Sequence, residues 1–111
     1  MSYLKVEILL PLYHNKGKTG RRKKIEGGIY LETFNDIMDK FGGCTIDNTP
    51  LLGGWVDPNT KKRISDENKT YWVVCKKTRE NIEFFHKLKK KLKIRFEQQD
   101  IMIYYVVINK F

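Results

Sequence analysis

The 111-residue sequence predicts one ferredoxin-like α+β domain, with a four-stranded antiparallel sheet and two helices on one face of it. Two amphipathic helical patterns alternate with strand patterns in the order strand, helix, strand, strand, helix, strand. The last strand pattern, residues 101–108, is apolar on both faces and therefore needs cover on both. Because two helices cover only one face, we expect something else on the other face, as in a dimeric α+β barrel.

The first half of the chain predicts a strand followed by a helix. Residues 3–13 alternate as a strand, with Lys5 and Glu7 on the face opposite the apolar side chains. Residues 28–41 carry an apolar stripe at helical spacing, and Gly42 ends this helix. The apolar residues concerned are Leu4, Val6, Ile8 and Leu10 in the strand and Tyr30, Phe34, Ile37, Met38 and Phe41 in the helix.

The second half predicts two strands, a helix and a final strand. A short strand covers residues 51–56, and residues 57–60 form a turn. Residues 70–75 are β-branched and aromatic, which is typical of a strand. The second helix covers residues 79–93, with Thr78 as its N-cap. Its buried stripe consists of Ile82, Phe85, Leu88, Leu92 and Phe96.

Aromatic residues are expected on the sheet face that no helix covers. Depending on strand register, that face presents Tyr3, Leu9, either Tyr71 or Trp72, and either Tyr104 or Tyr105. Such a surface is unusual for a monomer, so we expect two copies to pack sheet against sheet. Lys5 and Glu7 keep part of the face polar. A ligand cleft and a base-stacking surface are the alternative explanations.

The charge of the chain indicates attraction to polyanions. Its formal net charge is +9, from 22 basic and 13 acidic residues. Basic residues gather in two loops and along the second helix, and several neutralised phosphates would give non-specific affinity for nucleic acid. The candidates are Lys16, Lys18, Arg21, Arg22, Lys23, Lys24, Lys61, Lys62, Arg63, Lys87, Lys90 and Lys91. Residues 70–75 lack the RNA-recognition signature, and a solvated lysine-rich surface explains the same pattern.

Three segments resemble a group of small bacterial ferredoxin-like proteins of unassigned function. These are Phe41-Gly42-Gly43-Cys44-Thr45, Gly54-Trp55-Val56-Asp57-Pro58, and Arg95-Phe96-Glu97-Gln98-Gln99-Asp100-Ile101. They match an FGG-x-T helix end, a G-x-W-x-D-P turn and an F-x-Q-x-x-I entry to the last strand. The opening Leu10-Pro11-Leu12-Tyr13 also fits, whereas the basic loop from Lys16 to Lys24 departs from the pattern. The resemblance implies the fold and assigns no activity.

No group of residues identifies a reaction. The polar residues expected near strand ends are His14, Asp57, Asp66, Glu67 and Tyr71, without an evident nucleophile–base pair. The string Gly17-Lys18-Thr19 lacks the preceding glycine that a phosphate-binding P-loop requires. Cys44 and Cys75 lack metal-site spacing, so we expect no metal or cofactor and a reduced, cytosolic protein. From the opening strand pattern and the short apolar runs we expect no signal peptide and no membrane-spanning segment.

These observations favour a non-enzymatic binding protein that forms a small homodimer through its sheet. Nucleic-acid binding through the basic loop and helix is the alternative, and a small-molecule enzyme of the dimeric α+β barrel type is the third hypothesis. Trp55 has two interpretations: a plug at the end of the core, which its usual burial favours, or an exposed interface anchor.

Overall fold

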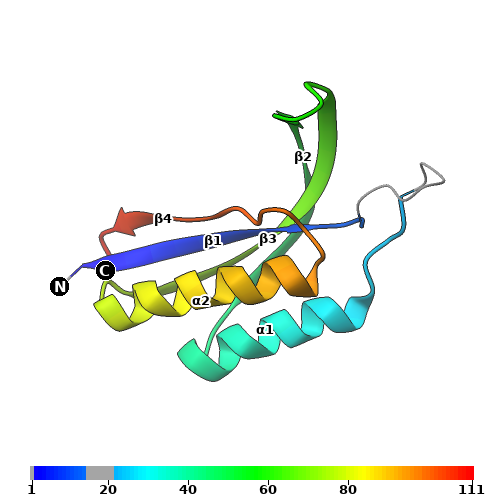
Figure 1. The fold of residues 1–111 in the computed structure, drawn as a ribbon. Coiled ribbons are helices and arrows are strands. Elements are labelled where there is room, and N and C mark those ends of the chain that lie inside the picture. The colour runs from blue at the N-terminus through cyan, green and yellow to red at the C-terminus, as the bar shows by residue number, and fades with distance from the viewer. Residues whose placement is uncertain (1, 15–21) are drawn as a thin grey trace.

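The computed structural model describes residues 2–14 and 22–111 and confirms the predicted α+β architecture. The elements are β1 (Tyr3–Pro11), α1 (Gly27–Phe41), β2 (Thr45–Val56), β3 (Arg63–Lys76), α2 (Arg79–Arg95) and β4 (Ile103–Ile108). The strands form one antiparallel sheet in the order β2-β3-β1-β4, and both helices lie against the same face (Figure 1). No helix in the described part of the chain is long and apolar enough to span a membrane.

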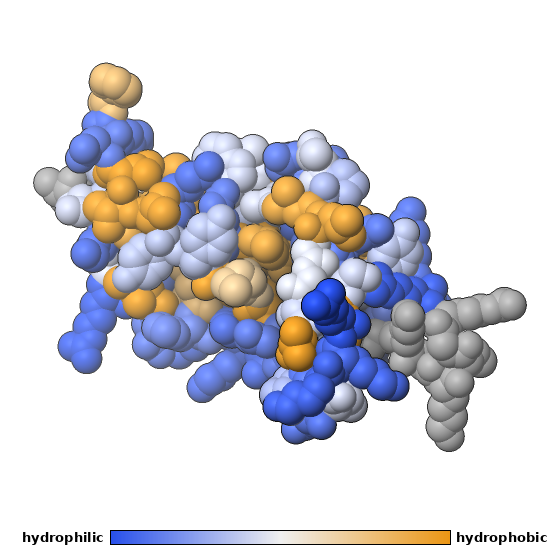
Figure 2. Space-filling view, turned by 90° about the horizontal axis from the view of Figure 1, so that it is seen from above, coloured by the Kyte–Doolittle hydropathy of each residue, from blue (hydrophilic) through white to orange (hydrophobic). Residues whose placement is uncertain are grey.

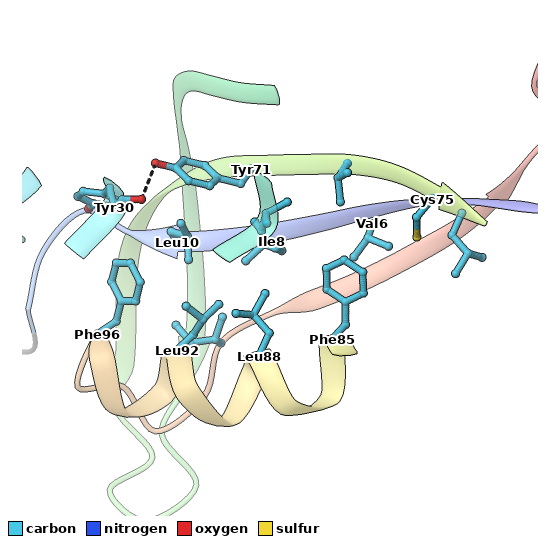
Figure 3. Packing of buried hydrophobic residues seen from close by; sticks show 14 of the residues in the cluster. Val6, Ile8, Leu10, Tyr30, Tyr71, Cys75, Phe85, Leu88, Leu92 and Phe96 are labelled. Carbon is cyan, nitrogen blue, oxygen red and sulfur yellow. Dashed lines mark hydrogen bonds between the residues drawn. The ribbon is translucent and has the colours of Figure 1, made fainter. Parts of the chain in front are cut away.

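The core lies between the sheet and the two helices. The alternating apolar residues of β1 are buried, as predicted, while Lys5 and Glu7 face away from the helices. Figure 3 shows the stripe of α2 pointing at the sheet from below. The labelled residues of that stripe are Phe85, Leu88, Leu92 and Phe96, all buried. Burial of these side chains provides the main apolar contribution to folding.

Side chains also fix how the helices begin, end and pack. Gly42 adopts a φ of 73°, and its N–H bonds to the Met38 carbonyl at 2.8 Å, which ends α1 as predicted. The Thr78 hydroxyl accepts the Asn81 N–H at 3.1 Å, which confirms the N-cap of α2. At the far end of α2, Arg95 bonds to Asp36 of α1 at 2.8 Å. This ion pair ties the two helices together.

A long hairpin extends from the sheet, and the sequence did not predict it. Strands β2 and β3 have 12 and 14 residues, and after a register irregularity between Asp47 and Leu51 they continue to Val56 and Arg63. We call residues 51–68 the arm. Figure 1 shows it rising above the sheet face opposite the helices. The radius of gyration is 15.1 Å, against about 13 Å for a compact domain of this size.

The structure decides between the alternatives that the sequence left open for two aromatic residues. Trp55 does not plug the core, because it lies on the arm and is 41% exposed. Tyr71 is not on the uncovered face: it is 2% exposed, points toward the helices, and its hydroxyl lies 3.5 Å from the Tyr30 carbonyl (Figure 3). The register that pairs Glu7 with Trp72 decides this, because neighbouring residues of a strand face opposite ways.

Candidate functional site

On the sheet face that no helix covers, side chains form rows across the inner strands β3 and β1 and the edge strand β4. Trp72, Glu7 and Tyr104 form one row by their pairing, and the next row contains Lys5 between Val74 and Val106. A further row places Tyr3 between Lys76 and Ile108. Figure 2 views the molecule from this side and shows apolar surface along it, bordered by hydrophilic residues. We call the side chains of these rows the open face.

A charged pair lies in the middle of the open face. The Lys5 ammonium is 3.6 Å from the Glu7 carboxylate and 4.7 Å from the centre of the Trp72 ring. On the other side, hydrogen bonding with the Glu7 carboxylate raises the pKa of the Tyr104 phenol, because a neighbouring anion disfavours the phenolate. Glu7 therefore has a cation and a phenol hydroxyl as partners, and two aromatic rings flank the pair.

Strand β4 is exposed on both of its faces. Tyr104 and Val106 belong to the open face, whereas Tyr105 and Val107 point to the helix side, where they are also about half exposed. Tyr105 was one of two alternatives for the open face, and the register selects Tyr104 instead. The strand forms one edge of the sheet, and its sequence, IYYVVI, has no charge and no proline. Natural edge strands usually carry charged residues or a proline, which hinder pairing with other chains.

The structure brings some of the predicted nucleic-acid contacts together and separates others. Lys61, Lys62 and Arg63 lie at the tip of the arm, and the Arg22 guanidinium donates to the Ser65 carbonyl of the same arm. The exposed lysines of α2 lie on the helix layer, on the side of the sheet away from the open face (Figure 1). These are Lys87, Lys90 and Lys91. The predicted contacts Lys16, Lys18 and Arg21 lie outside the described residues.

The residues expected near strand ends do not form a catalytic group. Asp57 is used in the turn, where its carboxylate accepts the Asn59 N–H at 2.8 Å. His14 lies 3.3 Å from Glu97, and Asp66 lies opposite Gly53 in the arm. Among the described residues, His, Cys, Asp and Glu side chains form no group of three or more with the geometry to hold a metal ion.

The architecture is similar to that of a known enzyme. No family model matches the chain, and no curated protein matches it in sequence. Among solved structures, a phage SAM lyase in complex with S-methyl-5'-thioadenosine has the same fold, with a TM-score of 0.66 and 11% sequence identity. The similarity covers 97% of this chain and 90% of the lyase. At this identity the similarity shows the fold, which is compatible with binding and with enzymatic roles.

Proposed function

We propose that this chain is a binding protein that works as a homodimer, with two copies packed through their open faces. The observation that carries the proposal is the pairing of Lys5 and Glu7 at the centre of a surface that is otherwise apolar and aromatic, apart from Lys76 at its end. A two-fold axis through this point would place Lys5 of each copy beside Glu7 of the other, so the surface is complementary to itself in charge.

Burial supports the same arrangement. Tyr104 and Val106 are 42% and 46% exposed, so a second copy would remove apolar surface from water. Packing two open faces would also enclose Trp72 and Glu7 of both copies, which creates a polar and aromatic site for a bound molecule.

A charge exchange tests the homodimer. Changing Glu7→Lys leaves two lysines at the centre of each open face, so like charges meet across the two-fold axis and the dimer should dissociate. The double variant Lys5→Glu with Glu7→Lys restores one charge of each sign and should restore the dimer. Sedimentation velocity over a concentration series measures both. A mass that does not change with the single reversal contradicts the proposal.

A second candidate function is binding of an adenosine thioether on the open face. The observation that favours it is the fold of the phage SAM lyase, which was solved with S-methyl-5'-thioadenosine bound. The open face offers groups that such a ligand could use: the Glu7 carboxylate for ribose hydroxyls, and the Trp72 ring for the adenine if the Lys5 ammonium, 4.7 Å from the ring centre, moves aside. No catalytic residue is carried over, since the two sequences share 11% identity.

Calorimetric titration separates the two candidates. S-methyl-5'-thioadenosine and SAM are titrated into the wild type and into Trp72→Ala, with adenosine as the comparison ligand. Saturable heat that is lost in Trp72→Ala supports the thioether site. Absence of heat with every ligand leaves the homodimer proposal intact and removes the second candidate.

A further inference from the structure

The arm and Arg22, which precedes α1 in the chain, meet at one corner of the molecule. The Arg22 guanidinium donates to the backbone carbonyl of Ser65, which lies on β3 opposite Gly54. An open depression next to this contact is bordered by Trp55 and Arg63 as well as by Ser65. Residues more than forty positions apart in the sequence therefore form one surface, which we call the arm corner. It lies apart from the open-face rows described above.

Basic residues lie at both ends of the arm. Lys61, Lys62 and Arg63 lie at its tip, and Lys69 follows its base, with Glu67 on the same side of β3 between Arg63 and Lys69. Burial lowers the pKa of the Lys69 ammonium, and repulsion from the nearby Lys24 ammonium lowers it further. The Lys69 ammonium also lies 3.5 Å from the centre of the Tyr30 ring.

The arm contains three acidic residues, Asp57, Asp66 and Glu67, beside Lys61, Lys62 and Arg63. Glu67 pairs with Leu52, away from the tip. The Asp57 carboxylate accepts backbone N–H groups of the turn, which leaves the neighbouring Lys61 and Lys62 exposed at the tip. Asp66 lies against Gly53, since a Cβ on that glycine would approach the Asp66 carboxylate oxygen to 2.7 Å. Asp66 thus occupies the middle of the arm, away from the basic tip.

Trp55 adds a flat aromatic ring beside the basic tip. It pairs with Ile64, so its side chain starts from the face of the arm opposite to Arg63 and Ser65, and all three residues border the depression. Trp55 is 41% exposed, whereas tryptophan side chains in folded proteins are mostly buried. Basic grooves with an exposed aromatic ring bind single-stranded nucleic acid, because phosphates pair with the cations and unpaired bases stack on the ring. Bases in a duplex are already stacked and paired, so they are not available to such a ring.

We propose that the arm corner binds single-stranded nucleic acid, with Trp55 as the stacking surface for one base and the basic residues of the arm tip and Arg22 as phosphate contacts. The lysines of α2 take no part, because they project from the helix layer on the other side of the sheet. This activity is separate from the proposed homodimer, which uses the open face.

Two charge-matched variants test the site. The arm variant carries Lys61→Glu, Lys62→Glu and Arg63→Glu, and the helix variant carries Lys87→Glu, Lys90→Glu and Lys91→Glu. Both lower the net charge by the same amount, and all six side chains are exposed, so both variants should fold. Fluorescence anisotropy with labelled single-stranded DNA, single-stranded RNA and a duplex is recorded across a salt series. The arm variant should lose about tenfold or more in affinity for single strands, and the helix variant about twofold or less.

The tryptophan provides a second, independent readout. Trp55→Ala should weaken single-strand binding about fivefold or more, and Trp55→Phe should restore most of it. Because the chain contains two tryptophans, Trp72→Phe leaves Trp55 as the sole fluorophore, and its emission should be quenched by single strands. Equal losses in the arm and helix variants, duplex binding as tight as single-strand binding, or no effect of Trp55→Ala would each overturn the proposal. The mass in solution should stay unchanged in all arm variants, so failure here is separable from failure of the homodimer.

Discussion

Glu7 and Tyr104 lie opposite each other on β1 and β4, and their hydrogen bond raises the pKa of the Tyr104 phenol. The variant Glu7→Gln removes the negative charge that disfavours the phenolate, so we expect the pKa of Tyr104 to fall toward its ordinary value of 10.0. Nuclear magnetic resonance of a ring-labelled tyrosine measures this, with Tyr105 on the same strand as the control. An unchanged pKa of Tyr104 would mean that Glu7 is not its partner in solution.

Tyr30 and Tyr71 make stability depend on alkaline pH. Burial raises the pKa of both phenols from 10.0 to about 12. The unfolded chain therefore releases these protons near pH 10 while the folded chain keeps them, so stability is full below pH 10 and falls as the pH rises toward 12. Denaturant unfolding at several pH values should show this decline. In Tyr71→Phe the decline should be shallower than in the wild type.

The hydroxyls of the same two tyrosines should contribute different amounts to the free energy of unfolding. The Tyr30 hydroxyl donates to the Pro11 carbonyl at 2.5 Å, whereas the Tyr71 hydroxyl lies 3.5 Å from its acceptor. Tyr30→Phe leaves a buried carbonyl without its donor and should cost about 1–3 kcal/mol of unfolding free energy. Tyr71→Phe should cost less than about 1 kcal/mol. Chemical denaturation at neutral pH compares the two, and equal costs would contradict the assigned hydrogen bonds.

We expect Arg95 to contribute far more to the stability of the fold than the exposed basic residues of α2. Its guanidinium donates to the Thr33 hydroxyl at 3.0 Å and to Asp36 at 2.8 Å, and its side chain is only 13% exposed. Arg95→Met leaves both partners without a donor, so we expect a loss of about 1–3 kcal/mol in unfolding free energy. Lys90→Met, at an exposed position of the same helix, should change stability by about 0.5 kcal/mol or less. Equal effects would show that the interhelical contact is not maintained.

Two adjacent glycines give a matched test of the end of α1. Gly42 has a φ of 73°, whereas Gly43 lies outside this left-handed region, and a Cβ at either position would meet nothing within 4 Å. Gly42→Ala should therefore destabilise the protein by about 1–2 kcal/mol through backbone strain alone. Gly43→Ala should be close to neutral. Thermal denaturation of the two variants provides the comparison, and the reverse order would contradict the helix end described here.

The sequence predicted those elements whose apolar residues follow one clear period. The alternation along β1 and the stripe of α2 directly identified the buried positions, because burial of a face requires that period. The arm was missed because residues 57–69 are almost all polar, and their strand structure depends on pairing across the hairpin, not on local preference.

The candidate sites were predictable only in part, for a geometric reason. Tyr71 and Trp72 are adjacent, and only the strand register decides which of them faces the helices. The contact between Arg22 and Ser65 joins segments that no sequence pattern connects, so the arm corner could not be anticipated. The prediction that helices leave one face of β4 uncovered is confirmed at Tyr104 and Val106. The expectation that they cover its other face is not met, because Tyr105 and Val107 are also about half exposed.

Neighbouring valines of β4 allow the most direct test of the homodimer. Val106 faces the open face and Val107 the helix side, and they are 46% and 55% exposed. Multi-angle light scattering of the wild type, Val106→Lys and Val107→Lys measures the mass in solution at matched concentrations. We expect a dimer for the wild type and for Val107→Lys and a monomer for Val106→Lys. A monomeric wild type, or a dimer that survives Val106→Lys, would contradict association through the open face.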